Sequence, residues 1–177
     1  MAKRLERKVV KKMIKILDEE TINLVAAGEV VERPLSVVKE LVENSIDALA
    51  SAITVEIKGG GIDFIRVTDN GSGIEKDQIQ TAFLPHATSK ISGRDDLSSI
   101  NSLVFRGEAL SSICAVAKVE MITRTHDYIS GIRYTIENDR TEITEIGAPE
   151  GTTIIIRDLF FNTPARRQFL KKRSQVV

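Results

Sequence analysis

The sequence predicts an α+β fold, a two-layer α/β sandwich in which helices cover one face of a mixed, mostly antiparallel sheet. Three observations predict this fold. An amphipathic helix pattern begins near Pro34. The triplet Gly59-Gly60-Gly61 joins two runs rich in β-branched residues, which is a hairpin signal. Four further strand patterns follow one another in the second half of the chain.

Two helices are expected before the hairpin. Asp18 is a suitable N-cap for a helix that runs to about Ala27, where Gly28 would end it. Pro34 opens the second helix. The apolar face of this second helix is expected to comprise Val38, Leu41, Val42, Ile46 and Leu49.

The rest of the chain alternates between strands and helices. Hairpin strands are expected over 53–57 and 62–68, and a helix over 75–83. Residues 84–104 are polar and predict a long loop, which in a compact domain is usually a functional lid or a disordered segment. The later elements are a helix over 107–116, strands over 118–124, 131–137, 141–146 and 152–158, and a basic helix from Pro164.

Composition is consistent with one soluble intracellular domain. The 177 residues suffice for a sizeable core, and Lys+Arg and Asp+Glu both number 25, so net charge predicts neither a nucleic-acid nor a membrane partner. A single cysteine, Cys114, excludes an internal disulfide framework and lies in an apolar run, so we expect a buried structural thiol. No apolar run is long enough to span a bilayer and no secretory signal is evident, which predicts a cytoplasmic protein.

The first twelve residues differ from the remainder. Six are basic and only Glu6 is acidic. We interpret residues 1–12 as an extension, either an expression tag or a basic arm, and residues 13–177 as the domain. A basic arm would bind nucleic acid in a salt-sensitive manner.

Two polar motifs suggest the chemistry. Glu40, Asn44, Asp47 and Ala48 share one face of the helix from Pro34, because they lie about one or two helical turns apart. The second motif, Asp69-Asn70-Gly71-Ser72-Gly73, follows the hairpin. A phosphate-binding Gly-x-x-x-x-Gly-Lys-Ser/Thr loop is absent from the sequence. Each motif alone also fits a simpler explanation, a solvated helix face and an ordinary turn.

Together the two motifs resemble those of the GHKL ATPases, the superfamily that includes DNA gyrase, Hsp90 and histidine kinases. Further stretches resemble its MutL family of DNA mismatch repair proteins, and these are Ala26–Pro34, His86–Ile91, Phe105–Leu110, Gly151–Thr153 and Asn162–Arg167. The resemblance covers residues 13–172. It implies the two-layer Bergerat fold, with ATP and Mg²⁺ as ligands.

The resemblance also implies roles for particular residues. Glu40 would be the general base that positions and deprotonates the attacking water. Asn44 would contribute an amide oxygen to Mg²⁺, whose other ligands would be phosphate oxygens and waters. Asp69 would accept a hydrogen bond from the adenine amino group, whereas it would face the carbonyl oxygen of guanine with like polarity. Glu43, the competing acid, points elsewhere on the helix and is expected to be solvated or salt-bridged.

The remaining implied contacts surround the nucleotide. Asp47 and Ala48 would face it from the helix, Gly71 and Gly73 would let the backbone approach the base, and Thr152 would support Asp69 directly or through water. Phosphate contacts would come from a lid and from backbone amides at a helix N-terminus, and the residues concerned are Thr88, Ser89, Lys90, Arg106, Gly107, Glu108, Ala109 and Leu110.

Two positions depart from the family pattern, which usually has glycine at both. Leu49 follows the helix of Glu40, and we expect it simply to extend that helix. Val104 precedes Phe105, and a β-branched residue would strain a backbone that needs positive φ. We therefore expect impaired closure of the lid on ATP.

The resemblance implies further properties of a longer protein. A second, transducer domain would supply a lysine to the γ-phosphate, so a chain ending at Val177 should bind nucleotide weakly and hydrolyse it very slowly or not at all. ATP-driven lid closure and homodimerisation are implied, with a MutS-type mismatch-recognition partner, downstream repair factors and weak DNA contact, in a prokaryotic, nucleoid-associated setting. The alternative is a non-catalytic protein- or DNA-binding module that retains the fold. The terminal basic cluster is expected to be either a DNA-facing patch or a solvated helix face, and it comprises Arg166, Arg167, Lys171, Lys172 and Arg173.

Overall fold

The computed structural model describes residues 15–16, 18–85, 87, 109–137 and 140–174 of the chain. The first helices are α1 (Glu19–Val30) and α2 (Pro34–Asp47), and a hairpin of β1 (Ile53–Lys58) and β2 (Phe64–Asp69) follows them. The remaining elements are α3 (Ile79–Ala82), α4 (Ala109–Cys114), β3 (Lys118–Arg124), β4 (Gly131–Glu137), β5 (Arg140–Ile146), β6 (Gly151–Arg157) and α5 (Pro164–Ser174).

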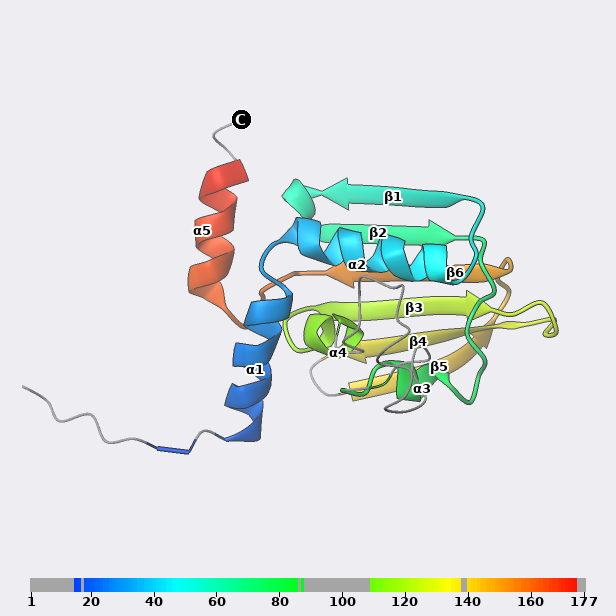
Figure 1. The fold of residues 1–177 in the computed structure, drawn as a ribbon, viewed down its shortest axis with the longest axis horizontal. Coiled ribbons are helices and arrows are strands. Elements are labelled where there is room, and N and C mark those ends of the chain that lie inside the picture. The colour runs from blue at the N-terminus through cyan, green and yellow to red at the C-terminus, as the bar shows by residue number, and fades with distance from the viewer. Residues whose placement is uncertain (1–14, 17, 86, 88–108, 138–139, 175–177) are drawn as a thin grey trace, which may run out of the picture.

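The six strands form one sheet in the order β1-β2-β6-β3-β4-β5, and every pairing between them is antiparallel. Helices α2 and α4 lie over one face of this sheet, while α1 and α5 lie at one end of it, on the left in Figure 1. The predicted two-layer α+β fold is confirmed.

The core lies between the helices and this face of the sheet. Because side chains alternate between faces along each strand, the register aligns apolar residues in rows across the sheet. One row contains Ile65, Ile156, Val119 and Ile136, and the next contains Val67, Ile154, Met121 and Tyr134. Helices α1 to α4 all contribute side chains to this core or close beside it, including Ala27, Leu41, Ile79 and Ile113.

Helix α1 begins as the sequence predicts but ends later. The Asp18 side chain accepts a hydrogen bond from the Thr21 amide at 2.8 Å, which confirms the cap. Gly28 does not end the helix, which continues to Val30. Its carbonyl oxygen accepts a bond from Arg166 Nη2 at 3.0 Å, and a Cβ on Gly28 would lie 3.1 Å from that guanidinium. Gly28 therefore makes room for a side chain of α5.

The predicted apolar face of α2 is only partly correct. Val37, Leu41 and Ser45 are its buried residues, whereas Ile46 is 57% and Leu49 87% exposed. The prediction was wrong at Ile46 and Leu49 because the stripe of buried residues on α2 ends at Ser45.

Leu49 was expected to extend α2, but it does not. The helix ends at Asp47, and Leu49 adopts the left-handed conformation with φ 59°. The Leu49 amide donates to the Ile46 carbonyl oxygen at 2.9 Å, and the Ala50 amide donates to that of Ser45 at 3.1 Å. This is a Schellman motif with leucine at the position that glycine usually occupies.

The helix predicted over 75–83 is much shorter in the structure. Only Ile79–Ala82 is helical, after a turn closed by the bond from the Gln78 amide to the Glu75 carbonyl oxygen at 2.9 Å. Ile79 is its one fully buried side chain, so little packing energy supports a longer helix. Most of the predicted loop over 84–104 lies outside the described residues.

Cys114, at the end of α4, packs against the core. Burial raises the pKa of its thiol to about 12, so the thiol is protonated at neutral pH. A protonated thiol packed against the core is consistent with the structural role expected for Cys114.

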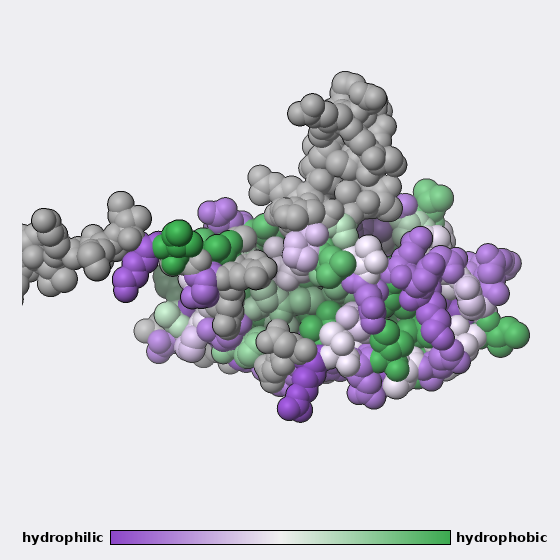
Figure 2. Space-filling model, turned by 90° about the horizontal axis from the view of Figure 1, so that it is seen from below, coloured by the Kyte–Doolittle hydropathy of each residue, from purple (hydrophilic) through white to green (hydrophobic). Residues whose placement is uncertain are grey.

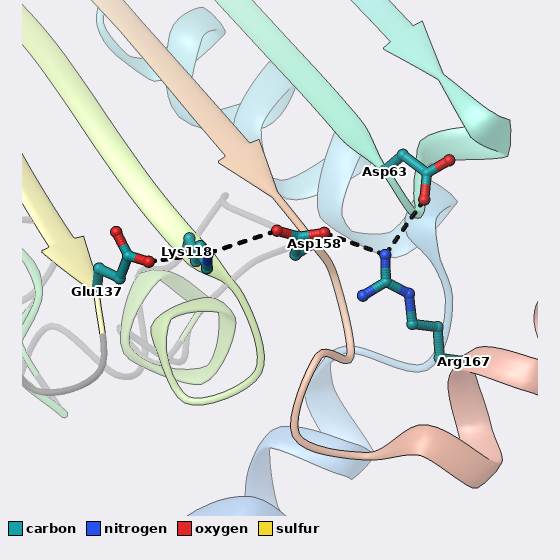
Figure 3. A network of polar contacts seen from close by, with 5 residues as sticks. All are labelled: Asp63, Lys118, Glu137, Asp158 and Arg167. Atoms are coloured by element: carbon teal, nitrogen blue, oxygen red, sulfur yellow. Dashed lines mark hydrogen bonds and ion pairs between the residues drawn. The ribbon is translucent and has the colours of Figure 1, made fainter.

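A chain of ion pairs attaches α5 to the sheet (Figure 3). Arg167 Nη2 lies 3.2 Å from Asp63 Oδ1 and 3.1 Å from Asp158 Oδ1. Lys118 Nζ lies 3.6 Å from Asp158 Oδ2 and 2.8 Å from Glu137 Oε1. The network therefore joins α5 to the ends of β2, β6, β3 and β4.

Arg166 makes a second attachment of α5. It donates to the carbonyl oxygens of Gly28 and Glu32, both at 3.0 Å, and its guanidinium carbon lies 4.7 Å from the centroid of the Phe160 ring. Neither predicted role of the basic cluster fits Arg166 and Arg167, because both side chains are engaged within the domain.

The surface seen from below mixes hydrophilic side chains with hydrophobic ones that occur singly or in small groups (Figure 2). Such scattered apolar residues are normal for a protein surface. No helix in the described part of the chain is both long enough and apolar enough to cross a membrane.

Candidate functional site

At one end of the sheet the apolar rows give way to polar side chains. Asp69 ends β2, Thr152 lies beside it on β6, and Thr123 pairs with Thr152 from β3. Ile53 and Ile132 flank this trio on the outer strands. Polar groups on a face that helices cover are costly unless they are hydrogen-bonded, so this row marks a candidate site.

Three neutral donors hold the Asp69 carboxylate. Its Oδ2 accepts from Ser45 Oγ at 2.8 Å, and its Oδ1 accepts from the amides of Gly71 at 2.9 Å and Thr152 at 3.1 Å. A carboxylate has about four acceptor positions, so about one stays available. Within the described residues no cation pairs with Asp69, and its negative charge is held in place without being neutralised.

The predicted contact between Thr152 and Asp69 is present, and it is direct. The backbone amide makes it, whereas the Thr152 hydroxyl lies 3.1 Å from Thr123 Oγ1. Thr123 Oγ1 also donates to the Gly151 carbonyl oxygen at 3.2 Å and accepts from the Ile74 amide at 2.9 Å. The two threonines thus connect β6 and β3 to the segment that follows Gly73.

Glycines are required around Asp69 because backbones pack closely there. A Cβ on Gly71 would lie 2.7 Å from the Ala48 carbonyl oxygen, and one on Gly73 would collide with the carbonyl of Arg124. Gly73 also has φ +73°. The loop therefore packs against the end of α2 and against β3. The expected approach of Gly71 and Gly73 to a base stays a prediction.

Helix α2 brings its polar face to the same end of the sheet. Glu40, Asn44 and Ala48 are partly buried, and Asp47 is exposed. Ala48 contacts the Asp69 loop, because its carbonyl oxygen accepts from the Ser72 amide at 2.9 Å. Asn44 directly precedes Ser45, the residue that bonds to Asp69.

Glu43 behaves as the sequence predicted. Its Oε1 lies 3.5 Å from Lys39 Nζ, one helical turn earlier, so it forms a salt bridge. Glu40 thus stays the acid proposed for catalysis on this helix.

Helix α4 supplies the part of the expected phosphate site that the structure describes. Ala109 and Leu110 begin this helix, which contacts α1, α2 and β3. The other expected contacts lie outside the described residues, and these are Thr88, Ser89, Lys90, Arg106, Gly107 and Glu108. Val104 lies outside them as well, so its predicted effect on a lid stays a prediction.

The donor set near α2 suits magnesium bound largely through a nucleotide. Among the described residues there is no cluster of three or more His, Cys, Asp or Glu side chains that could hold a metal. One amide oxygen, such as that of Asn44, fits an ion that keeps several waters and takes its remaining ligands from phosphates.

Two residues of the site were missed from the sequence, Ser45 and Thr123. Ser45 is 3% exposed and follows Leu41 by four residues on the buried stripe of α2. Thr123 is 1% exposed and continues the alternation of Val119 and Met121 on β3. Both could have been found from the sequence, because each is a polar residue at a position where helical spacing or strand alternation predicts an apolar one.

A hollow on the opposite face of the sheet has a different character. Glu120 on its floor accepts from Arg133 Nε at 2.7 Å and from Arg157 Nη1 at 2.8 Å. Burial raises the pKa of Glu120, but hydrogen bonds and charges from Arg157 and Arg133 outweigh it, so the pKa lies below its ordinary value. The charge of Glu120 is thus neutralised by arginines within the domain, which indicates a structural role.

Comparison with known families gives an independent line of evidence. Residues 32–154 match the model of the histidine kinase-, DNA gyrase B- and HSP90-like ATPases. The DNA mismatch repair protein MutL of Agathobacter rectalis is 65% identical over 160 residues, which are 89% of this chain and 24% of that protein. MutL of Clostridium botulinum is 55% identical over 165 residues, 93% of this chain and 25% of that protein. The chain thus spans about a quarter of these relatives.

Solved structures agree with this assignment. A crystal structure of the N-terminal domain of a DNA repair protein superimposes with a TM-score of 0.73 at 33% identity, over 87% of this chain and 44% of that one. The MutL ATPase domain of Aquifex aeolicus complexed with ADP superimposes with a TM-score of 0.62 at 34% identity, over 81% of this chain and 52% of that one.

Proposed function

Because the chain belongs to the histidine kinase-, DNA gyrase B- and HSP90-like ATPases, and within them to the MutL proteins, we propose that it binds ATP and ADP as the nucleotide-binding domain of a mismatch repair switch. The observation that carries this proposal is the Asp69 carboxylate, which three neutral donors fix and which retains an acceptor position. The ADP complex of the Aquifex aeolicus MutL ATPase domain supports it.

Asp69 would select adenine. Its free acceptor position suits the adenine amino group, whereas guanine would present a carbonyl oxygen and leave two acceptors facing each other. The hydrogen bonds from Ser45, Gly71 and Thr152 prevent the carboxylate from turning away, so little reorganisation would be needed on binding.

Asn44 and the start of α4 would hold the phosphate end. Asn44 would give its amide oxygen to Mg²⁺, which would neutralise phosphate charge when bound. Asp47 and Ala48 would line the nucleotide from α2. Backbone amides near Ala109 and Leu110, with the lid and loop residues before them, would face the phosphates.

Glu40 would be the general base for hydrolysis. It lies one turn before Asn44 on α2, and would therefore be near the γ-phosphate if Asn44 holds the metal. The carboxylate would accept a proton from water as the water oxygen attacks phosphorus, and ADP would leave.

The switch itself belongs to a longer protein. We propose that residues 13–177 are the nucleotide-binding half, that residues 1–12 are an extension, and that a transducer domain completes the site with a lysine. ATP would close the lid and drive homodimerisation, and a MutS-type protein, downstream factors and DNA would be the partners. Hydrolysis by this chain alone would be very slow or absent.

Calorimetric titration tests the nucleotide site directly. ADP and a non-hydrolysable ATP analogue are titrated with and without Mg²⁺ into the parent chain and into Glu40→Ala. We expect magnesium-dependent binding to both, because Glu40 would act on water and not on the nucleotide. Absence of binding to the parent would refute the proposed function.

The second candidate is a non-catalytic protein- or DNA-binding module that retains the fold with hydrolysis disabled, and Val104 favours it. In this case nucleotide would bind without productive lid closure. ATP turnover separates the two candidates, since Val104→Gly should raise turnover if strain in the lid limits it. Unchanged ATP turnover in Val104→Gly would refute the idea that strain at Val104 limits lid closure. Robust ATP turnover by the parent chain would contradict the slow hydrolysis expected of it.

A further inference from the structure

Thr123 lies outside every motif that suggested the function, yet it belongs to the polar row, in which it is the neighbour of Thr152. It is 1% exposed and pairs with Thr152 across β3 and β6. Its hydroxyl contacts Thr152, the Gly151 carbonyl oxygen and the Ile74 amide. Within the described part of the chain its hydroxyl has no hydrogen bond to Asp69, and Thr152, whose amide donates to that carboxylate, lies between them.

The hydrogen-bonding capacity of a hydroxyl determines the direction of these bonds. A threonine hydroxyl donates one hydrogen bond and accepts two. Thr123 Oγ1 donates to the Gly151 carbonyl oxygen at 3.2 Å and accepts from the Ile74 amide at 2.9 Å. The Gly151 carbonyl oxygen can only accept, so both contacts of Thr123 Oγ1 are hydrogen bonds together when Thr152 Oγ1, at 3.1 Å, is the donor of the second.

This arrangement commits the only proton of the Thr152 hydroxyl. What remains on Thr152 Oγ1 is acceptor capacity, and the backbone amide of the same residue donates to the Asp69 carboxylate, which is also an acceptor. We infer that Thr123 is a specificity-determining positioning residue, which makes the Thr152 hydroxyl an acceptor and so strengthens the preference of the site for adenine over guanine. The inference rests on the proposed nucleotide-binding function.

The physical reason is the polarity of the two bases. Two neighbouring acceptors suit an amino group, or a water that donates to both, and they disfavour a carbonyl oxygen. A Thr152 hydroxyl released from Thr123 would be free to rotate and to donate to a guanine carbonyl, which would recover part of the lost binding. Loss of Thr123 should therefore reduce discrimination and not merely affinity.

The test compares ADP and GDP affinities of the parent, Thr123→Val and Thr123→Ser. Valine keeps the shape and removes the hydroxyl, while serine retains it. We expect the ratio of GDP to ADP dissociation constants to fall about 10-fold in the valine variant, which corresponds to one hydrogen bond of about 1.4 kcal/mol. The serine variant should keep the parental ratio.

Equal weakening of ADP and GDP in Thr123→Val, with an unchanged ratio, would overturn the inference and leave Thr123 a merely structural residue that holds Ile74. Thermal unfolding checks that the variant folds. If the valine variant does not fold, Thr123→Cys takes its place, because its thiol is of similar size and hydrogen-bonds only weakly. The ratio of GDP to ADP dissociation constants then tests the inference in the same way. If the parent binds neither nucleotide, the proposed function itself is refuted. This result is distinct from one in which the parent binds ADP and Thr123→Val leaves the ratio unaltered, which refutes only the inference about Thr123.

Discussion

The central part of the sheet has aspartates at both ends, Asp69 at one and Asp63 and Asp158 at the other, and the two ends treat them in opposite ways. At one end Asp69 is bound by two amides and a hydroxyl. At the other end Asp63 and Asp158 share Arg167, and Asp158 also faces Lys118 (Figure 3). The first carboxylate keeps its charge available, and the others have theirs neutralised.

The difference separates a candidate binding group from structural groups of the same chemical type. The side chains of Asp63 and Asp158 are 49% and 42% exposed, so solvent screens their ion pairs, which contribute little each. Asp69 is partly buried beside Ser45, which is 3% exposed, and no cation among the residues that the structure describes explains its fixed orientation. A negative charge that the fold orients but does not neutralise indicates a ligand with a donor.

The largest effect is expected from replacing the two kinds of aspartate in turn. Asp69→Asn would remove the negative charge and replace one of the two oxygens that now accept from Ser45, Gly71 and Thr152 by an NH₂ group, which is itself a donor. We expect ADP affinity to fall about 30- to 100-fold, a loss of about 2–3 kcal/mol. Asp158→Asn is the matched control, because asparagine tolerates the φ of 54° at this position. It should change ADP affinity less than about 2-fold. Equal losses in both variants, measured by calorimetry, would contradict the contrast between the two ends.

Arg166 tests the end of the sheet that faces α5. Arg166→Ala would leave two carbonyl oxygens, of Gly28 and Glu32, without their charged donor and remove the contact with Phe160. We expect the free energy of unfolding to fall by about 2 kcal/mol and ADP affinity to stay unchanged. Gln168→Ala, at an exposed position of α5, serves as control in chemical denaturation. A loss of ADP affinity in Arg166→Ala would show that the two ends are coupled.

Ser45 tests how much the orientation of Asp69 contributes. Ser45→Ala removes one of three donors to the carboxylate, and we expect ADP affinity to fall about 5- to 10-fold, or about 1 kcal/mol. The control is Ser36→Ala in the first turn of the same helix. An affinity of Ser45→Ala equal to that of the control would mean that Gly71 and Thr152 suffice to orient Asp69.

Glu120 provides a pH-dependent test of a neutralised carboxylate. Its pKa is lower in the folded protein than the ordinary value of 4.5, so its contribution to stability is present above that value and is lost as pH falls through the folded pKa. Glu120→Gln should lower the free energy of unfolding by about 1 kcal/mol at pH 7 and by less at acid pH. Denaturation at several pH values checks this, and a difference between variant and parent that does not shrink on acidification would refute it.

The smallest expected effect concerns Leu49. Leu49→Gly should raise the free energy of unfolding by about 0.5–1 kcal/mol, because glycine adopts the φ of 59° without the cost that leucine bears, while Leu49 buries little surface. Leu49→Ala keeps the backbone cost and should leave stability nearly unchanged. If Leu49→Ala raised the free energy of unfolding as much as Leu49→Gly, the effect would come from removing the exposed side chain and not from the backbone conformation.

Periodicity and local signals were sufficient for most of the elements. Alternation identified the strands, and Asp18 and Pro34 marked helix starts, because these signals arise within a few residues of chain. Helix ends were less predictable. Gly28 and Leu49 both misled, since what decides each position is a partner or a backbone conformation that the residue type alone does not reveal.

The fold class, the strand pattern and the spacing of Glu40, Asn44 and Asp69 follow from the order of residues along the chain, because periodicity and motifs are local. The groups that orient Asp69, and those that neutralise other carboxylates, are known only once the chain is folded. Ser45, Asp69, Thr123 and Thr152 come from α2, β2, β3 and β6, and strand order brings them together. Hydrogen bonds between residues 24 to 83 positions apart depend on that order, which no local pattern encodes.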